Sequence, residues 1–183
     1  LDYGHFAFIA TGCDNVTVEN IYVGDLENQR DVVNFMQCNN TTAKNVKVLK
    51  CSNDIIKLGS DYSLGFVRNV SGTYVENIYA DYIGGGNVFQ LGSETFGDFS
   101  DLTIKNVTIT QNADKAGLGF CVNDGGSVRN VTIENVNLAN CSGGITLMAS
   151  DRQGRVPDAM VKAGTIDNVT IKNATLKHNQ GNS

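Results

Sequence analysis

Asp101-Leu-Thr-Ile-Lys-Asn-Val-Thr-Ile109 is the stretch that decides the fold, because close copies of it recur along the whole chain. Each copy carries a Glu-Asn or Lys-Asn pair between short runs in which apolar and polar residues alternate. The copies lie at residues 15–23, 72–80, 130–138 and 168–176, with a weaker one at 40–48. Internal repeats of about 20 to 50 residues are typical of solenoids and propellers.

The Asn of each pair marks the register of the repeat, and successive marks are 25, 32, 29, 29 and 38 residues apart. Apolar residues stand four and two positions before the mark but one and three positions after it. A straight strand cannot change parity in this way and keep one face buried. A corner can, because Asn tolerates the left-handed backbone conformation. The pattern therefore predicts a corner, with a stacked ladder of side chains, at Asn20, Asn45, Asn77, Asn106, Asn135 and Asn173.

The residue before each mark supports the stacking of successive copies. In chain order these residues are Glu19, Lys44, Glu76, Lys105, Glu134 and Lys172, so their charges alternate. Parallel strands lie about 4.8 Å apart, and like charges at that distance repel. The alternation therefore favours copies that lie directly above one another.

A second family of short strands lies between the marks. We expect strands at residues 31–35, 54–58, 87–91 and 144–148, with looser members at 5–9 and 118–122. No helical periodicity is long enough to compete with this pattern. The sequence thus predicts an all-β fold, a right-handed parallel β-helix (solenoid) of about six coils with at least three short strands in each. We expect a single domain over residues 1–183, as a fragment of a longer helix whose end coils contact missing coils or another chain.

Composition and charge exclude several classes of function. The chain has 183 residues, 41% of them hydrophobic and 18% charged, with a net charge of -5. A negative chain without clustered Lys and Arg argues against a nucleic-acid partner. No apolar run reaches the length of a membrane span, so we expect no membrane partner.

The five cysteines form neither a complete disulfide framework nor a metal motif. Cys13 and Cys38 occupy the same column of the repeat, where packing as small hydrophobes is favoured and a bridge between them is left open. Without a Cys-x-x-Cys or Cys/His cluster, a structural zinc site is unsupported, and we expect neither a metal nor a cofactor.

Asp31 and Asp54 are the candidate catalytic residues, because both begin the same kind of strand on successive coils. Two stacked carboxyls divide into an acid and a base when one raises the pKa of the other. The alternative is that each Asp initiates a turn by accepting backbone N–H groups. Polar side chains around them are suited to sugar hydroxyls, and the candidate substrate-binding residues are Asn34, Asn53, Lys57, Asn87 and Gln90.

At these residues the chain resembles the pectin-lyase-like β-helix superfamily, and most closely the polygalacturonase-type (family 28) glycoside hydrolases. That family carries N-T-D, D-D, G-H-G and R-I-K motifs on successive coils and hydrolyses with inversion through Asp acid and base. Here Gln29-Arg30-Asp31 and Asn53-Asp54 keep two of the three acids. Gly86-Asn87-Val88 and Thr146-Leu147-Met148 replace the motifs that supply the basic residues.

The stretch Gly85-Gly-Asn-Val-Phe-Gln-Leu-Gly-Ser-Glu94 still looks like the family's G-G-H-G-I-S-I-G-S-E. Because the basic residues that grip galacturonate are missing, the resemblance implies a hydrolase for a neutral glycan, similar to dextranase- and α-1,3-glucanase-like relatives. We therefore expect a polysaccharide or oligosaccharide as the partner, and a secreted or cell-surface location.

Two other functions remain open from the sequence. One is a non-catalytic β-solenoid, such as an adhesin, a tailspike-like stalk or a carbohydrate-binding module. The other is a polysaccharide lyase or epimerase, which needs a base near the sugar's α-proton together with cationic groups. Arg152, Arg155 and Lys162 in the longest interval between repeats are the residues available for that chemistry.

Overall fold

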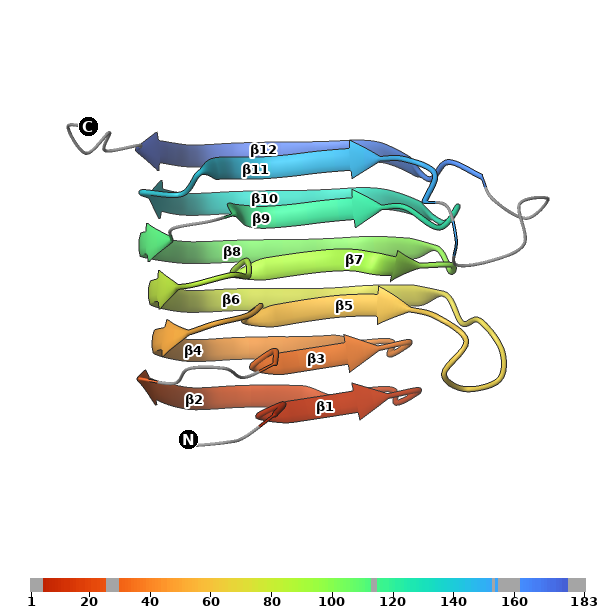
Figure 1. Cartoon of the computed structure of the whole chain (residues 1–183), viewed down its shortest axis with the longest axis horizontal. Helices are drawn as coiled ribbons and strands as arrows, with labels where there is room; N and C mark the ends of the chain where they lie inside the picture. Colours follow the sequence, from red (N-terminus) through yellow and green to blue (C-terminus); the bar gives the residue numbers. More distant parts are fainter. Residues whose placement is uncertain (1–4, 26–29, 113–114, 153, 155–161, 178–183) are drawn as a thin grey trace.

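The computed structural model describes residues 5–25, 30–112, 115–152, 154 and 162–177 as two parallel sheets with no helix. One sheet has the order β1-β3-β5-β7-β9-β11 and the other β2-β4-β6-β8-β10-β12, so the chain alternates between them (Figure 1). The strands of the first sheet are β1 (Phe8–Thr11), β3 (Val33–Met36), β5 (Ile56–Ser60), β7 (Phe89–Thr95), β9 (Ala116–Val122) and β11 (Gly143–Ala149). Those of the second sheet are β2 (Thr17–Asp25), β4 (Thr41–Cys51), β6 (Val70–Ile83), β8 (Phe99–Asn112), β10 (Ser127–Ala139) and β12 (Thr165–Lys177).

The strands stack as the coils of a parallel β-helix, which confirms the predicted fold class. The marks pair in register from coil to coil: Asn45 follows Asn20 by 25 residues, and Asn173 follows Asn135 by 38. Each sheet has six strands, in agreement with about six coils. The right-handed sense of the coil stays a prediction.

The corner at each mark is confirmed, and it lies inside the long strands of the second sheet. All six Asn residues have positive φ angles, between 52° at Asn173 and 59° at Asn20. In β4, the buried residues change from odd to even positions at Asn45. Each long strand is therefore bent into two straight segments, which with the short strand gives three segments per coil. The Asn side chains form the predicted ladder, each Nδ2 donating to Oδ1 of the preceding coil at 3.0–3.1 Å.

A second ladder, which we did not predict, lies five residues before the first. Its members also have positive φ angles, and Asn168 donates to Asn130, which donates to Asp101. The ladder is interrupted at Gly72, which has no side-chain acceptor. Asp101 stands directly above this gap, where a side chain that only accepts hydrogen bonds leaves no donor unpaired.

The short strands begin later than the sequence predicts. Strands were expected to start at Asp31, Asp54 and Asn87, but β3, β5 and β7 each start two residues further on. The reason is that two consecutive side chains face the core there: Val32 with Val33, Ile55 with Ile56, and Val88 with Phe89. Consecutive inward side chains are incompatible with a straight strand, so the backbone bends. We call this bend the second corner.

The core is one continuous cluster between the sheets, filled by the inward columns of the repeat. Phe35, Phe89, Phe99 and Phe120 are its largest fully buried side chains. None of the five cysteines forms a disulfide in this structure, and Cys38, Cys51 and Cys141 are buried as small hydrophobes. The bridge between Cys13 and Cys38, left open from the sequence, is not formed in this structure.

The alternating charge column is confirmed on the outside of the second sheet. Glu19 pairs with Lys44 in the strand register, as Glu134 does with Lys172. Lys44 Nζ lies 3.6 Å from Glu76 Oε2, and Lys105 Nζ lies 3.4 Å from Glu134 Oε2. The last coil is less covered than the middle ones: Ile171 is 43% exposed, whereas the equivalent Ile133 is fully buried. The expected end-coil contacts stay a prediction.

Candidate functional site

The second corner places one outward position just before each short strand and a second one, three residues later, on the strand. On three neighbouring coils these positions hold Asp31 and Asn34, Asp54 and Lys57, and Asn87 and Gln90. The strand register aligns Asn34 with Lys57 and Lys57 with Gln90. Backbone bonds from Val32 to Asp54 and from Ile55 to Asn87, both 2.9 Å, keep the upstream residues in the same register. The sequence thus builds a block of polar side chains, two columns wide, on the outside of the helix.

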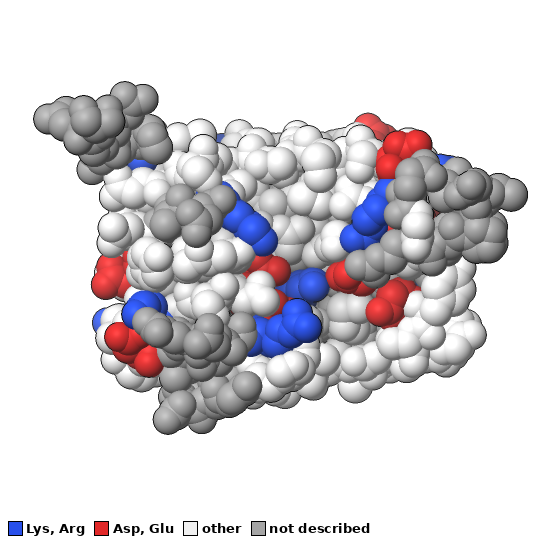
Figure 2. Space-filling view, in the orientation of Figure 1, with Lys and Arg blue, Asp and Glu red and all other residues white. Residues whose placement is uncertain are grey.

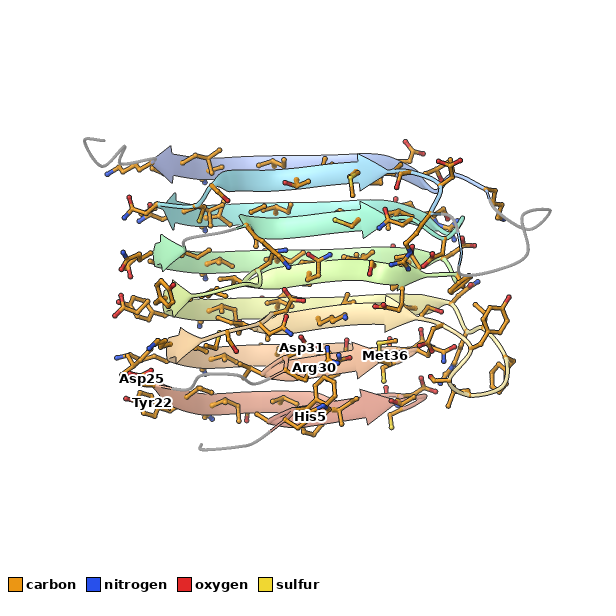
Figure 3. The ribbon with its side chains drawn as sticks, in the orientation of Figure 1. His5, Tyr22, Asp25, Arg30, Asp31 and Met36 are labelled. Atoms are coloured by element: carbon orange, nitrogen blue, oxygen red, sulfur yellow. The ribbon has the colours of Figure 1, made fainter. Side chains whose placement is uncertain are left out.

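These side chains line a cleft of about 500 Å³ on the outer face of the first sheet. All seven residues predicted as catalytic or substrate-binding line it: Asp31, Asp54, Asn34, Asn53, Lys57, Asn87 and Gln90. Charged side chains of both signs gather at the middle of this face (Figure 2), and Asp31 and Arg30 lie just before β3 (Figure 3). The structure therefore brings the candidates together, while their roles stay predictions.

The cleft is open because the two polar columns end in small residues. Gly119 of β9 pairs with Gln90, and Ala116 precedes it by three residues. A Cβ atom at Gly119 would lie 2.5 Å from Gln90 Oε1 and 2.8 Å from Asn87 Nδ2. The two amide side chains therefore lie over this glycine, and a larger residue there would displace them.

Asp31 is 3% exposed and accepts a hydrogen bond from Asn34 Nδ2 at 2.6 Å. Burial raises the pKa of its carboxyl, because removal from water disfavours the charged form. The Lys57 charge, the Asn34 hydrogen bond and the Arg30 charge act against this rise, in that order. Asp31 is thus a buried carboxyl whose ionised form is supported by two cations and an amide.

Asp54 is 7% exposed, and its Oδ1 accepts the backbone N–H of Asn87 at 2.7 Å. Burial raises the pKa of this carboxyl to about 6, and the Asp31 charge adds to the rise. The Asn87 hydrogen bond and the charges of Lys57 and Lys115 oppose it. A carboxyl with such a pKa holds its proton well above the range of an exposed Asp.

Lys57 is not free to act as a simple contact for a ligand. Its Nζ lies 3.2 Å from Glu94 Oε2, and the two side chains are only 21% and 17% exposed. Glu94 reaches Lys57 because β7 contains a bulge: the register moves from Leu58–Leu91 to Ser60–Thr95, which inserts two extra residues. Bulges of this kind re-aim side chains beside functional sites.

Asn87 and Gln90 are bound mainly to each other. Asn87 Nδ2 donates to Gln90 Oε1, and Gln90 Nε2 donates to the Leu91 carbonyl at 2.9 Å. Both amide atoms of Gln90 are therefore engaged within the protein. Among the described residues, Asn34 Oδ1 and Asn87 Oδ1 are buried acceptors without a donor. Unsatisfied buried groups are rare in native proteins, and strain, a functional role or a bound water or ion accounts for them.

Two neighbouring carboxyls with raised pKa values are suited to proton transfer. Asp54 can hold a proton near neutral pH while Asp31, with Lys57 and Arg30 nearby, ionises more readily. Pairs of acids with different environments are the usual arrangement for combined acid and base catalysis. Within the described ranges, no group of three or more His, Cys, Asp or Glu side chains is arranged to hold a metal ion.

Sequence reasoning missed Glu94, Lys115 and Arg30 as parts of the site. Arg30 stands beside Asp31 in the chain, so its place was available from the sequence alone. Lys115 and Glu94 lie outside the regular repeat, where no periodicity indicates the direction of a side chain. The bulge that brings Glu94 to Lys57 has no signature in the repeat pattern.

The cations proposed for a lyase do not have the arrangement that a lyase would need. Arg152 donates through Nε and Nη2 to Asp124 at 3.1 and 2.6 Å, and through Nη2 to the Ser93 carbonyl at 2.7 Å. The Asp124 side chain is 1% exposed, so this pair joins the coils as a structural clamp. Lys162 is exposed, and Arg155 lies outside the described residues.

No helix that could span a membrane occurs in the described part of the chain. Comparison of the chain with protein-family models, curated proteins and solved structures found no match.

Proposed function

We propose that the protein is a glycoside hydrolase that cleaves a polysaccharide by acid and base catalysis from Asp54 and Asp31. The observation that carries the proposal is the pair of buried carboxyls on neighbouring coils, open to one cleft, with the pKa of Asp54 at about 6. Glycosidases use two carboxyls of this kind on opposite sides of the scissile bond.

In the proposed reaction, the Asp54 carboxyl donates its proton to the glycosidic oxygen as the bond from that oxygen to the anomeric carbon breaks. The Asp31 carboxylate removes a proton from the water that attacks the anomeric carbon. One proton thus leaves Asp54 and one arrives at Asp31, and the products are two sugar hydroxyls. General acid and base groups contribute about 10²- to 10⁴-fold each to such rates.

The resemblance to polygalacturonase-type enzymes supports this proposal at particular residues. Asp31 and Asp54 stand at two of that family's acid positions, and residues 85–94 resemble its glycine-rich stretch. The family's His, Arg and Lys positions are occupied here by Asn87, Thr146 and Met148. We therefore propose a neutral glycan as substrate, and with it a secreted or cell-surface location.

The test is release of reducing sugar from a panel of neutral glucans, with polygalacturonate as the acidic comparison. Asp54→Asn and Asp31→Asn should each lower kcat by at least about 100-fold on the substrate that is cleaved, because each removes a proton-transfer group. Asp101→Asn, which changes an exposed carboxylate on the other sheet, is the matched control and should retain activity. Full activity in both cleft variants would disprove the assignment.

A non-catalytic carbohydrate-binding solenoid is the second candidate. The observation that favours it is that both carboxyls are engaged by protein donors, Asp31 by Asn34 and Asp54 by the N–H of Asn87. Such bonds also occur where an Asp only stabilises a turn. Calorimetric binding of oligosaccharides without any released product, in wild type and in Asp54→Asn alike, would decide for this reading.

A further inference from the structure

Three neighbouring coils repeat one arrangement of side chains in the cleft, and the middle coil departs from it. Asn34 of β3 donates to Asp31, which lies three residues earlier, and Asn87, just before β7, donates to Gln90 three residues later. On the middle coil the same two positions hold Asp54, just before β5, and Lys57 of β5. On the coils to either side, the side chains at these two positions contact each other. Opposite charges at the same two positions on the middle coil would therefore be expected to form an ion pair.

Lys57 is bound to Glu94 instead. The separation of 3.2 Å between Nζ and Oε2 is that of a direct ion pair, and both side chains are mostly buried. The Asp54 carboxyl accepts the neutral N–H of Asn87, and no ion pair to Asp54 is found in the described part of the chain. The bulge in β7 carries Glu94 to Lys57, the cation three residues after Asp54 on the same coil.

We propose that Glu94 is a positioning residue that holds Lys57 away from Asp54 and thereby keeps Asp54 able to carry a proton. The catalytic consequence rests on the proposed hydrolase function, but the effect on the proton does not. Without the Glu94 charge, the ammonium of Lys57 turns to the nearest remaining carboxylates, Asp54 and Asp31.

The charges around Asp54 make its proton affinity depend on whether Lys57 contacts Glu94 or Asp54. The charge of Asp31 acts on it from the preceding coil, that of Lys57 from its own coil, and that of Lys115 from the segment just before β9. Arg30 and Glu94 act on the neighbouring Asp31. A cation within about 4–6 Å stabilises a carboxylate, and its effect is larger in a buried site than in water. A direct contact with Lys57 would therefore release the proton of Asp54 at lower pH.

The experiment measures the titration of Asp54 by ¹³C NMR of its carboxyl carbon, assigned by its absence in Asp54→Asn. In Glu94→Gln the midpoint should fall by about one pH unit, a tenfold loss of proton affinity. Glu134→Gln is the matched control, because it removes the same charge from an ion pair with Lys105 far from the cleft. It should leave the midpoint unchanged, and an unchanged midpoint in Glu94→Gln overturns the proposal.

Two further variants test that the effect passes through Lys57. In Lys57→Met with Glu94→Gln the midpoint should return to the wild-type value or above, and the same fall in this double variant overturns the proposal. In Lys57→Gln alone the midpoint should rise only slightly, because Glu94 already holds that ammonium. A large rise would show that Lys57 pairs with Asp54 in the wild type, and would also overturn it.

The hydrolase reading is tested separately with the same proteins. On a substrate that is cleaved, the alkaline limb of the kcat profile should move to lower pH in Glu94→Gln by the same amount as the NMR midpoint. A wild-type protein that cleaves nothing contradicts the proposed function, while the NMR titration still decides the role of Glu94.

Discussion

At the scale of single residues, the burial of Asp54 is the most consequential feature of the cleft. Burial of a carboxyl that is 7% exposed favours its neutral form over its ionised form, and no ion pair to it is found among the described residues. Its pKa of about 6 lies above the ordinary value of 3.8, so the native state binds this proton more tightly than the unfolded chain does. The stability that follows is fully present below about pH 4 and is lost as the pH rises through 6.

This pH dependence gives a prediction for Asp54→Asn that needs no substrate. Asn is close to a protonated Asp in shape and can still accept the N–H of Asn87. The variant should be close to the wild type in free energy of unfolding near pH 4 and exceed it by about 3 kcal/mol at pH 8. Urea unfolding at the two pH values measures the difference. A variant that is less stable than the wild type at pH 8 would contradict it.

Asp101→Asn is the control for that measurement, because the pKa of Asp101 is shifted in the opposite direction. Hydrogen bonds from Asn130 and Ser100 lower the pKa of this exposed carboxyl. Its contribution is therefore present above the ordinary Asp range and is lost as the pH falls. The variant should be less stable than the wild type only above the ordinary pKa of Asp. This is opposite in sign to the effect of Asp54→Asn.

At the scale of elements, the corner and its ladder are the features that the sequence specifies most directly. The parity change at Asn45 or Asn77 can be read from the sequence, because apolar residues stand at even distances before the Asn and at odd distances after it. The second corner was equally available, since Val32-Val33 and Ile55-Ile56 place two core residues in succession. We expected straight strands there and therefore placed their starts two residues early.

The cleft was less accessible to prediction than the scaffold. Asp31, Asp54 and their polar neighbours were found because they repeat from coil to coil, as the strands do. Glu94 was not assigned to the site, since its position depends on a bulge in β7. The bulge arises where β5 and β7 pair over segments of unequal length. Periodicity predicts only the features that recur from coil to coil, and the contact of Glu94 with Lys57 is not such a feature.

The ladder predicts a graded response to substitution at Asn77, in the middle of the stack. Asn77 has a φ of 57°, donates to Asn45 at 3.0 Å and accepts from Asn106 at 3.1 Å. Asn77→Ala should cost about 2 kcal/mol, because it loses both bonds and keeps a backbone conformation that Ala resists. Thermal or urea unfolding measures the loss.

Asn77→Gly separates the two causes. Glycine adopts the left-handed conformation without strain but lacks the amide, so it should cost about 1 kcal/mol, less than alanine. Equal losses in the two variants would mean that the corner is not strained at this residue. A larger loss for glycine would show that the unfolded chain, rather than the ladder, dominates the effect.

At the scale of the whole molecule, the stacking of coils makes stability a local quantity. Each coil contacts only the coils next to it in the stack, so the middle coils are supported on two sides and the outer coils on one. Leu176 on β12 is 56% exposed, whereas the equivalent Leu138 on β10 is 1% exposed. The apolar surface that holds a coil in place is therefore smallest at the ends.

Hydrogen exchange measured by mass spectrometry should reveal this gradient. Backbone amides of β6 and β8 should be the most protected, and those of the end coils, β1 and β2 and β11 and β12, the least, because opening an end coil breaks one interface instead of two. The difference should persist under conditions where global unfolding is negligible. Equal protection in all twelve strands would mean that the helix opens only as a unit.

The one-way direction of the Asn ladder gives the solenoid an electrical polarity along its axis. From Asn45 to Asn173, every amide directs its N–H bonds towards β2 and its oxygen towards β12. Each amide carries a dipole of about 3.5 D, and aligned dipoles add and strengthen one another, as they do in an α-helix. The positive end of the ladder therefore lies at Asn20 and its negative end at Asn173, so the ladder favours negative charge beside the first coil and positive charge beside the last.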